Sequence, residues 1–172
     1  WSLPGGALSL GLDPLSGLFL AVILAIGGLT AVYGAGYFHS SESRPAVGMG
    51  WLWFNILIAS MVVVVTARNT VLFLLAWETM TISSYFLVTW EDAPADTRRA
   101  GWTYLVAAHI GTAFLILFFT GLARSTGGFD LVPGTASMPA HAGLLFLAAI
   151  IGFGTKAGFV PLHVWLPEAH PA

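Results

Sequence analysis

The sequence contains no cysteine and very few charged residues. The absence of cysteine excludes disulfide bonds, thiolate metal sites and cysteine-ligated iron–sulfur clusters. Charged residues make up only 8% of the chain, whereas globular domains carry about 25%. The formal net charge is −2 and no basic patch is present, which argues against nucleic-acid binding. Because 57% of the residues are hydrophobic, the composition predicts an integral membrane protein.

Five long apolar segments follow one another along the chain. Each has about the 20 residues that a membrane-spanning helix needs, and none alternates between polar and apolar residues as a membrane β-strand does. The sequence therefore predicts an all-α fold, a polytopic bundle of about five transmembrane helices that forms a single membrane domain over residues 1–172. We expect the helices at residues 15–38, 46–66, 70–90, 99–122 and 141–160.

Glu78 is the one charged residue in the apolar segment 71–88. Roughly ten helical residues separate it from the polar pair 68–69, which places it near the membrane midplane. A charge there costs several kcal/mol, so it normally faces a partner or a hydrated cavity. Thr81 and Tyr85 follow at i+3 and i+7 and share its helix face. We interpret Glu78 as a proton-exchanging group; the alternative is a structural ion pair or a neutral, hydrogen-bonded acid.

Lys156 lies in an apolar segment that glycine and proline interrupt. The sequence from residue 150 to residue 161 is IIGFGTKAGFVP. Its glycines weaken a helix, and Pro161 cannot donate a hydrogen bond to the carbonyl of Ala157. We expect a discontinuous last helix with free carbonyls and water beside Lys156, because transporters use such breaks at their ion sites. The alternative for Lys156 is a side chain that snorkels to the interface.

Two histidines are further candidates for proton transfer. His109 is the titratable group in the middle of the segment 99–122, and imidazole exchanges protons near neutral pH. The alternative is a packed histidine that is hydrogen-bonded to a neighbouring helix. His163 follows Lys156 by seven residues, which suits a proton carrier at the exit of the broken helix.

The chain offers no convincing motif for a metal, a cofactor or catalysis. His163, Glu168 and His170 could be read as metal ligands, but two neighbouring prolines interrupt any shared helical face. The nearby glycines lack the preceding strand and the spacing of a phosphate or dinucleotide loop. We therefore expect no metal site, no cofactor and no catalytic residue on this chain.

Two long stretches resemble a known family. Residues 74–91 (LLAWETMTISSYFLVTWE) and 152–172 (GFGTKAGFVPLHVWLPEAHPA) are similar to the antiporter-like membrane subunits that respiratory complex I, Mrp-type sodium/proton antiporters and energy-converting hydrogenases share. Residues 12–20 (LDPLSGLFL) resemble the helix that precedes those motifs. The chain is most similar to the branch of hydrogenase-4 component B and formate hydrogenlyase subunit 3.

The resemblance implies roles for individual residues. Glu78 matches the charge-pairing glutamate of the family, and Lys156 matches the lysine on its discontinuous helix. In the family, the glutamate adjusts the proton affinity of the lysine, and the lysine hands protons towards the membrane centre. Since the family's core consists of two inverted repeats of helices, the resemblance implies that this chain is a fragment of a larger antiporter-like fold.

The resemblance also implies a function. We expect a proton-translocating membrane subunit of a redox-driven complex, of the hydrogenase-4, formate hydrogenlyase or NADH:quinone oxidoreductase type, with a relay through Glu78, Lys156, His109 and His163. The expected partners are other membrane subunits, a peripheral redox arm and the lipid of the inner (cytoplasmic) membrane. One alternative is an Mrp-type sodium/proton antiporter subunit without a redox partner. Another is a scaffold in which Glu78 and Lys156 merely form an ion pair.

Overall fold

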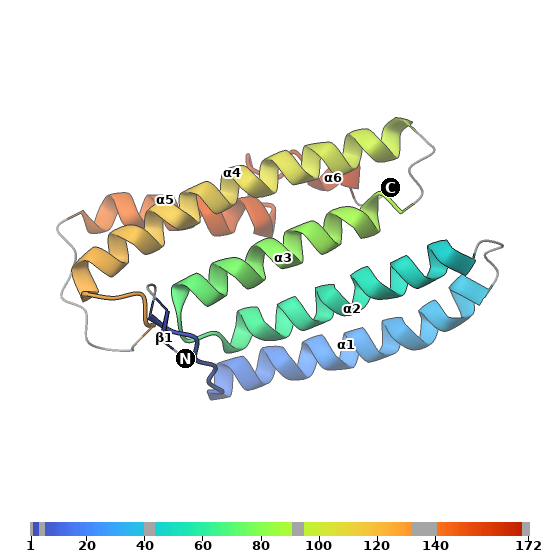
Figure 1. The fold of residues 1–172 in the computed structure, drawn as a ribbon. Coiled ribbons are helices and arrows are strands. Elements are labelled where there is room, and N and C mark those ends of the chain that lie inside the picture. Colours follow the sequence, from blue (N-terminus) through green and yellow to red (C-terminus); the bar gives the residue numbers. More distant parts are fainter. Residues whose placement is uncertain (1, 4–5, 40–43, 91–94, 132–140, 170–172) are drawn as a thin grey trace.

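A computed structural model describes residues 2–3, 6–39, 44–90, 95–131 and 141–169. Figure 1 shows long helices that lie side by side, each packed against the next one along the chain. Two short antiparallel strands precede them, β1 (Ser2–Leu3) and β2 (Gly6–Ala7). The predicted all-α bundle is confirmed, and its helices are α1 (Pro14–His39), α2 (Arg44–Thr66), α3 (Thr70–Val88), α4 (Ala95–Thr126), α5 (Ala142–Ala157) and α6 (Leu166–Ala169).

Four helices, α1 to α4, are long and apolar enough to cross a membrane. The fifth, α5, has 16 residues and is about 24 Å long, which is shorter than the hydrocarbon core of about 30 Å. Among the described residues there are thus four helices of spanning length and one shorter apolar helix, where the sequence predicted about five spans. Helix α4 is longer than the predicted 99–122, with Asp96 in its first turn and Arg124 in its last, as the helix dipole favours.

The end of α5 is set by Gly158, so that the helix stops at Ala157 rather than at the predicted residue 160. Gly158 has a left-handed backbone with φ +73°. Its N–H donates to the carbonyl of Thr155 at 3.4 Å, and the N–H of Phe159 donates to the carbonyl of Gly154 at 2.9 Å. These are the two hydrogen bonds of a Schellman motif, which ends a helix where glycine supplies the left-handed residue. The predicted break is therefore present, three residues before Pro161.

The start of α3 is fixed by Asn69. Its side-chain oxygen accepts hydrogen bonds from the N–H groups of Val71 and Leu72, at 2.9 and 3.3 Å, as an N-cap residue does. Its side-chain amide donates to Asp130 at 2.8 Å. Because the cap fixes where α3 begins, it also fixes the height of Glu78 in the bundle.

The connection between α2 and α3 is held by two other segments at the same end of the bundle. The N–H of Arg68 donates to the carbonyl of Ser9, and its own carbonyl accepts from Leu131, at 2.9 and 2.8 Å. The Arg68 guanidinium pairs with Asp13 at 2.6 Å. The backbone N–H of Ser16, which donates to Asp13 at 2.8 Å, and then the Arg68 side chain hold the pKa of Asp13 below its usual value.

The described core lies between α3, α4 and α5. Trp77, Leu115 and Phe119 form its buried cluster. The ring of Phe153 on α5 meets the Trp77 ring edge-on, with centroids 5.7 Å apart. These contacts tie α5 to both neighbours and place its C-terminal end beside them.

A close approach of backbones lets α5 lie directly against α4. A Cβ atom on Gly152 would come 2.6 Å from Cδ2 of Leu115 and 3.0 Å from the carbonyl oxygen of Gly111. Small residues at such crossings are typical of membrane helix pairs, because packing replaces the hydrophobic effect there.

Candidate proton-transfer site

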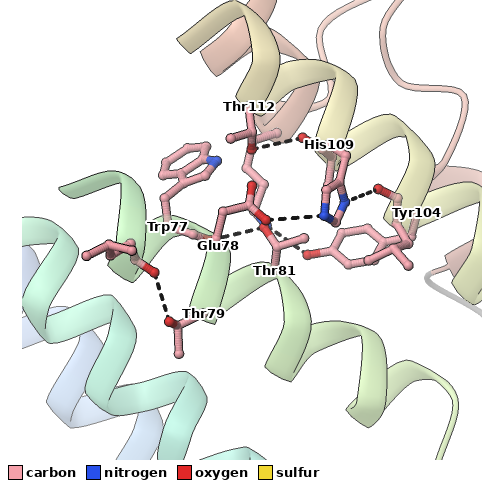
Figure 2. A network of polar contacts seen from close by, with 11 residues as sticks. Trp77, Glu78, Thr79, Thr81, Tyr104, His109 and Thr112 are labelled. Carbon is pink, nitrogen blue, oxygen red and sulfur yellow. Dashed lines mark hydrogen bonds and ion pairs between the residues drawn. The ribbon is translucent and has the colours of Figure 1, made fainter. Parts of the chain in front are cut away.

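Lys156 is held inside the bundle by hydroxyl groups from α3 and α4. Its Nζ donates to Thr81 Oγ1 at 3.0 Å and to the Tyr104 hydroxyl at 2.8 Å. The same nitrogen lies 5.1 Å from the ring centroid of Tyr104 and 5.7 Å from that of Trp77. Thr81 is fully buried and Tyr104 is 5% exposed. Figure 2 shows these two side chains pointing toward each other across the gap between their helices.

This environment suits the nitrogen of Lys156 in both of its protonation states. A neutral amine has two N–H groups, and the two hydroxyl oxygens accept both of them. An ammonium group has a third N–H, and the nearby faces of Trp77 and Tyr104 attract its positive charge. Thr81 is free to accept because its own hydroxyl proton goes to the carbonyl of Trp77 at 3.1 Å. The site can therefore hold Lys156 with or without its extra proton.

Trp165 closes the broken end of α5. The last carbonyls of a helix lack a regular intrahelical partner. The carbonyl of Thr155, which accepts the long hydrogen bond from Gly158 at 3.4 Å, also accepts from the indole N–H of Trp165 at 2.8 Å. The indole ring also meets the ring of Tyr104 edge-on, at a centroid distance of 5.2 Å. The segment after the break thus supports the tyrosine that accepts a hydrogen bond from Lys156.

Glu78 pairs with His109 about halfway along α3 and α4. His109 Nε2 lies 3.3 Å from Glu78 Oε2, and His109 Nδ1 lies 2.8 Å from the carbonyl oxygen of Leu105 (Figure 2). The Glu78 side chain is 27% exposed and that of His109 is 52% exposed. The second carboxylate oxygen, Oε1, is buried and has no hydrogen-bond partner among the residues that the structure describes.

Sequence comparison places these residues in a known family. The family described as "NADH:quinone oxidoreductase/Mrp antiporter, TM" matches residues 67–172, which is more than half of the chain and contains the whole site. The chain belongs to this family. The resemblance predicted from the two sequence motifs is therefore confirmed.

The relatives of the chain include subunits of several complexes. It is 37% identical to hydrogenase-4 component B of Escherichia coli (strain K12), over 96% of this chain and 25% of that protein. It is 30% identical to Na(+)/H(+) antiporter subunit A1 of Staphylococcus haemolyticus (strain JCSC1435), over 94% of this chain and 20% of that protein. The chain thus spans about a quarter of the length of the curated relatives it matches.

A solved structure shares the fold. A chain of respiratory complex I from Thermus thermophilus with bound aureothin matches with a TM-score of 0.75 and 23% sequence identity. The match covers 92% of this chain and 34% of that chain. The bundle described above is therefore a part of an antiporter-like fold, as the sequence predicted.

The sequence left open whether Glu78 and Lys156 touch, and the structure shows no ion pair between these two described residues. Within the described residues, the side chain in contact with the Glu78 carboxyl group is His109, whereas Lys156 donates to the hydroxyls of Thr81 and Tyr104. The reason is the height at which α5 ends. Its last turn meets α3 at Thr81, one helical turn beyond Glu78, so that a hydroxyl rather than the carboxylate receives the lysine.

The other predicted site residues have different surroundings. His163 lies in the turn after α5, and its Nδ1 is buried without a hydrogen-bond partner in the part of the chain that the structure covers. Tyr85, predicted to share the Glu78 face, lines a pocket of about 480 Å³ together with Trp53 and Trp102. His170 lies outside the described residues. The structure therefore places His109 beside Glu78, and leaves His163 without a hydrogen bond to Lys156.

Three residues of the site have no feature in the sequence that marks them as functional. Trp77 and Tyr104 look like ordinary aromatic residues of apolar helices, and Trp165 lies in the turn before α6. Tyr104 is 52 positions away from Lys156, so no spacing rule connects them. The usable clue for Tyr104 was its hydroxyl in an apolar stretch, because a buried hydroxyl needs a partner.

Proposed function

We propose that this chain is part of a proton-translocating membrane subunit of a redox-driven complex, of the hydrogenase-4, formate hydrogenlyase or NADH:quinone oxidoreductase type. The observation that carries the proposal is the position of Lys156, an ionisable amine held inside the bundle by Thr81 and Tyr104. Ionisable residues within membrane segments commonly mark ion or proton pathways. Membership of the family supports the same function.

In this proposal, Lys156 is the central exchange group of the relay. The amine takes up a proton through its lone pair and becomes an ammonium, while Thr81 and Tyr104 continue to accept two of its hydrogen bonds. Glu78 and His109 form a second group on α3 and α4. His163, which follows the break in α5, is the proposed carrier between Lys156 and the membrane surface.

Partner subunits supply the driving force in the proposed complex. Electron transfer in a peripheral redox arm changes the electric field at Lys156, and further membrane subunits carry the rest of the proton path. The proposed location is the inner (cytoplasmic) membrane. The choice of a redox-driven complex is supported by the relative named hydrogenase-4 component B, since it is the more similar of the two relatives compared above.

A second candidate function is that of a sodium/proton antiporter subunit without a redox partner. The observation that favours it is the 30% identity to Na(+)/H(+) antiporter subunit A1. The two candidates differ in what drives the ion, and they share Lys156 as the exchange group.

Substitutions in the full-length subunit of the intact complex test the proposal. Lys156→Met is expected to abolish redox-driven proton uptake into vesicles and Glu78→Gln to reduce it, while electron transfer to an artificial acceptor continues. His141→Gln, at the N-cap of α5 and without a side-chain cap hydrogen bond, is the matched control. Loss of sodium tolerance with no redox phenotype supports the antiporter candidate. Normal translocation in both variants leaves only a structural role and overturns the proposal.

A further inference from the structure

The protonation of His109 can be read from its hydrogen bonds. Its Nδ1 lies 2.8 Å from the carbonyl oxygen of Leu105. A carbonyl oxygen can only accept, so Nδ1 must carry a proton and donate it. The backbone of α4 thereby fixes the tautomer, and Nε2 becomes the nitrogen whose protonation can vary.

The contact between His109 and Glu78 then requires one more proton. His109 Nε2 lies 3.3 Å from Glu78 Oε2. An unprotonated Nε2 and an ionised carboxylate are both acceptors, and two acceptors repel each other at this distance. One proton must lie between them, either on Nε2 as an imidazolium or on Oε2 as a carboxylic acid. The pair has zero net charge in both arrangements.

We propose that Glu78 and His109 share a single proton and form an electrically neutral unit, so that Lys156 alone sets the net charge of this site. The inference deepens the proposed proton relay and rests on it for its functional meaning. A neutral pair also lowers the cost of the buried, unpartnered Oε1 of Glu78, because an unpaired buried charge costs far more free energy than a paired or neutral group.

The charged groups of the other elements do not change the net charge assigned to the Glu78–His109 pair. The described residues of the spans 14–36 and 47–66, in α1 and α2, contain no Asp, Glu, Lys, Arg or His. The ring of His163, in the turn after α5, makes no hydrogen bond to the site within the described chain. At the start of α4, Asp96 and Arg99 line a pocket of about 340 Å³ together with Glu168 of α6. Arg98 lines the separate pocket of about 480 Å³, and Arg124 lies in the last turn of α4.

The neutral pair predicts that His109→Gln changes the proton affinity of Lys156 more than Glu78→Gln does. Glu78→Gln leaves a neutral amide beside a neutral histidine, so the charge that Lys156 experiences is unchanged. His109→Gln removes the group that shares the proton, and the free Glu78 carboxylate then stabilises the ammonium form of Lys156. If Glu78 were instead a free carboxylate that tunes Lys156, the ranking would be reversed.

Spectroscopy on the intact complex measures the proton count directly. NMR spectra of the complex with ¹⁵N-labelled histidine report both ring nitrogens of His109 once the His109→Gln spectrum is subtracted. Infrared spectra report the Glu78 carboxyl group once the Glu78→Gln spectrum is subtracted. We expect a protonated Nδ1 at about neutral pH, together with one proton on either Nε2 or the carboxyl group. An unprotonated Nε2 beside an ionised carboxylate, or an imidazolium beside a carboxylic acid, overturns the inference. His141→Gln controls for the loss of any histidine.

The pH dependence of proton translocation provides the functional measurement. In His109→Gln, the pH of half-maximal translocation is expected to rise, because an opposite charge in the same site favours the protonated form of Lys156. In Glu78→Gln, any residual activity is expected to keep its midpoint to within about 0.3 unit, which is about a factor of two in proton affinity. A midpoint that falls in Glu78→Gln and stays in place in His109→Gln refutes the neutral pair. If the spectra show one shared proton but translocation survives the Lys156→Met change, the proposed function fails and the proton count stands.

Discussion

Replacing Thr81 by valine tests whether the hydroxyl of α3 stabilises the protonated form of Lys156. Thr81 is fully buried, and its Oγ1 accepts from Lys156 Nζ at 3.0 Å. Valine has nearly the same shape but no acceptor, so that the change removes one hydrogen bond and leaves the packing of α3 in place. Thr81→Ser keeps the hydroxyl and serves as the matched control.

The expected magnitude follows from the chemistry of the contact. A hydrogen bond to a charged group contributes about 1.5–3 kcal/mol. The hydroxyl of Tyr104 still accepts from Lys156 at 2.8 Å, so we expect the lower end of this range. One pH unit corresponds to about 1.4 kcal/mol. The neutral amine also donates to Thr81 and loses about 0.5–1.5 kcal/mol, so that only the difference, up to about 1 kcal/mol, favours deprotonation. The pH of half-maximal translocation should therefore fall by up to about 0.7 unit in Thr81→Val.

The assay is proton uptake by vesicles that contain the intact complex, followed with a pH-sensitive dye. The pH runs from about 5.5 to about 8.5, a window that includes the range in which histidine changes its charge. Thr81→Ser should follow the wild-type profile. A profile for Thr81→Val that coincides with the wild type, or equal impairment in Thr81→Ser, would show that the hydroxyl has no part in the protonation of Lys156.

Two further predictions concern stability. The pKa of Asp13 is lowered in the folded state, so its carboxylate stabilises the fold at pH values above its ordinary pKa of about 4. This contribution is lost as the pH falls through the lower, folded-state pKa. Asp13→Asn should therefore melt at a lower temperature than the wild type at neutral pH, and the difference in melting temperature should close in acid. A difference that does not depend on pH would contradict the role of the pair with Arg68. Gly152→Ala should lower stability by about 1–3 kcal/mol through overpacking, because the new Cβ meets Leu115. Gly28→Ala is the control, since nothing lies within 4 Å of its Cβ position, and it should be neutral or stabilising by up to about 1 kcal/mol in the same thermal assay. Equal losses of stability in both variants would refute the packing argument.

The helices themselves are largely a consequence of local sequence. Apolar runs of about 20 residues must satisfy their backbone hydrogen bonds within the segment if they are to enter a bilayer, so the positions of α1 to α4 could be predicted closely. The boundaries that were missed depend on single residues. Gly158 ends α5 earlier than Pro161 would, because its left-handed backbone closes a Schellman motif.

The site was predicted as a set of residues rather than as a set of contacts. A carboxylate and an amine in apolar helices are unusual enough to be identified from the sequence alone, since each costs free energy unless something compensates it. Their partners depend on which helices pack together and at what height. That is why the pairing of Glu78 with His109, and of Lys156 with Thr81 and Tyr104, could not be read from the spacing of residues.

The sequence by itself determined that this is a helical membrane protein of the antiporter-like family, with ionisable side chains at the heights of Glu78, His109 and Lys156. These properties follow from composition, from the length of apolar runs and from motifs that lie within single segments. Only the tertiary structure decided that Glu78 faces His109 and that the lysine is held by two hydroxyls. Such contacts join residues on different helices, and their geometry is set by the cap at Asn69, by the crossing at Gly152 and by the end of α5.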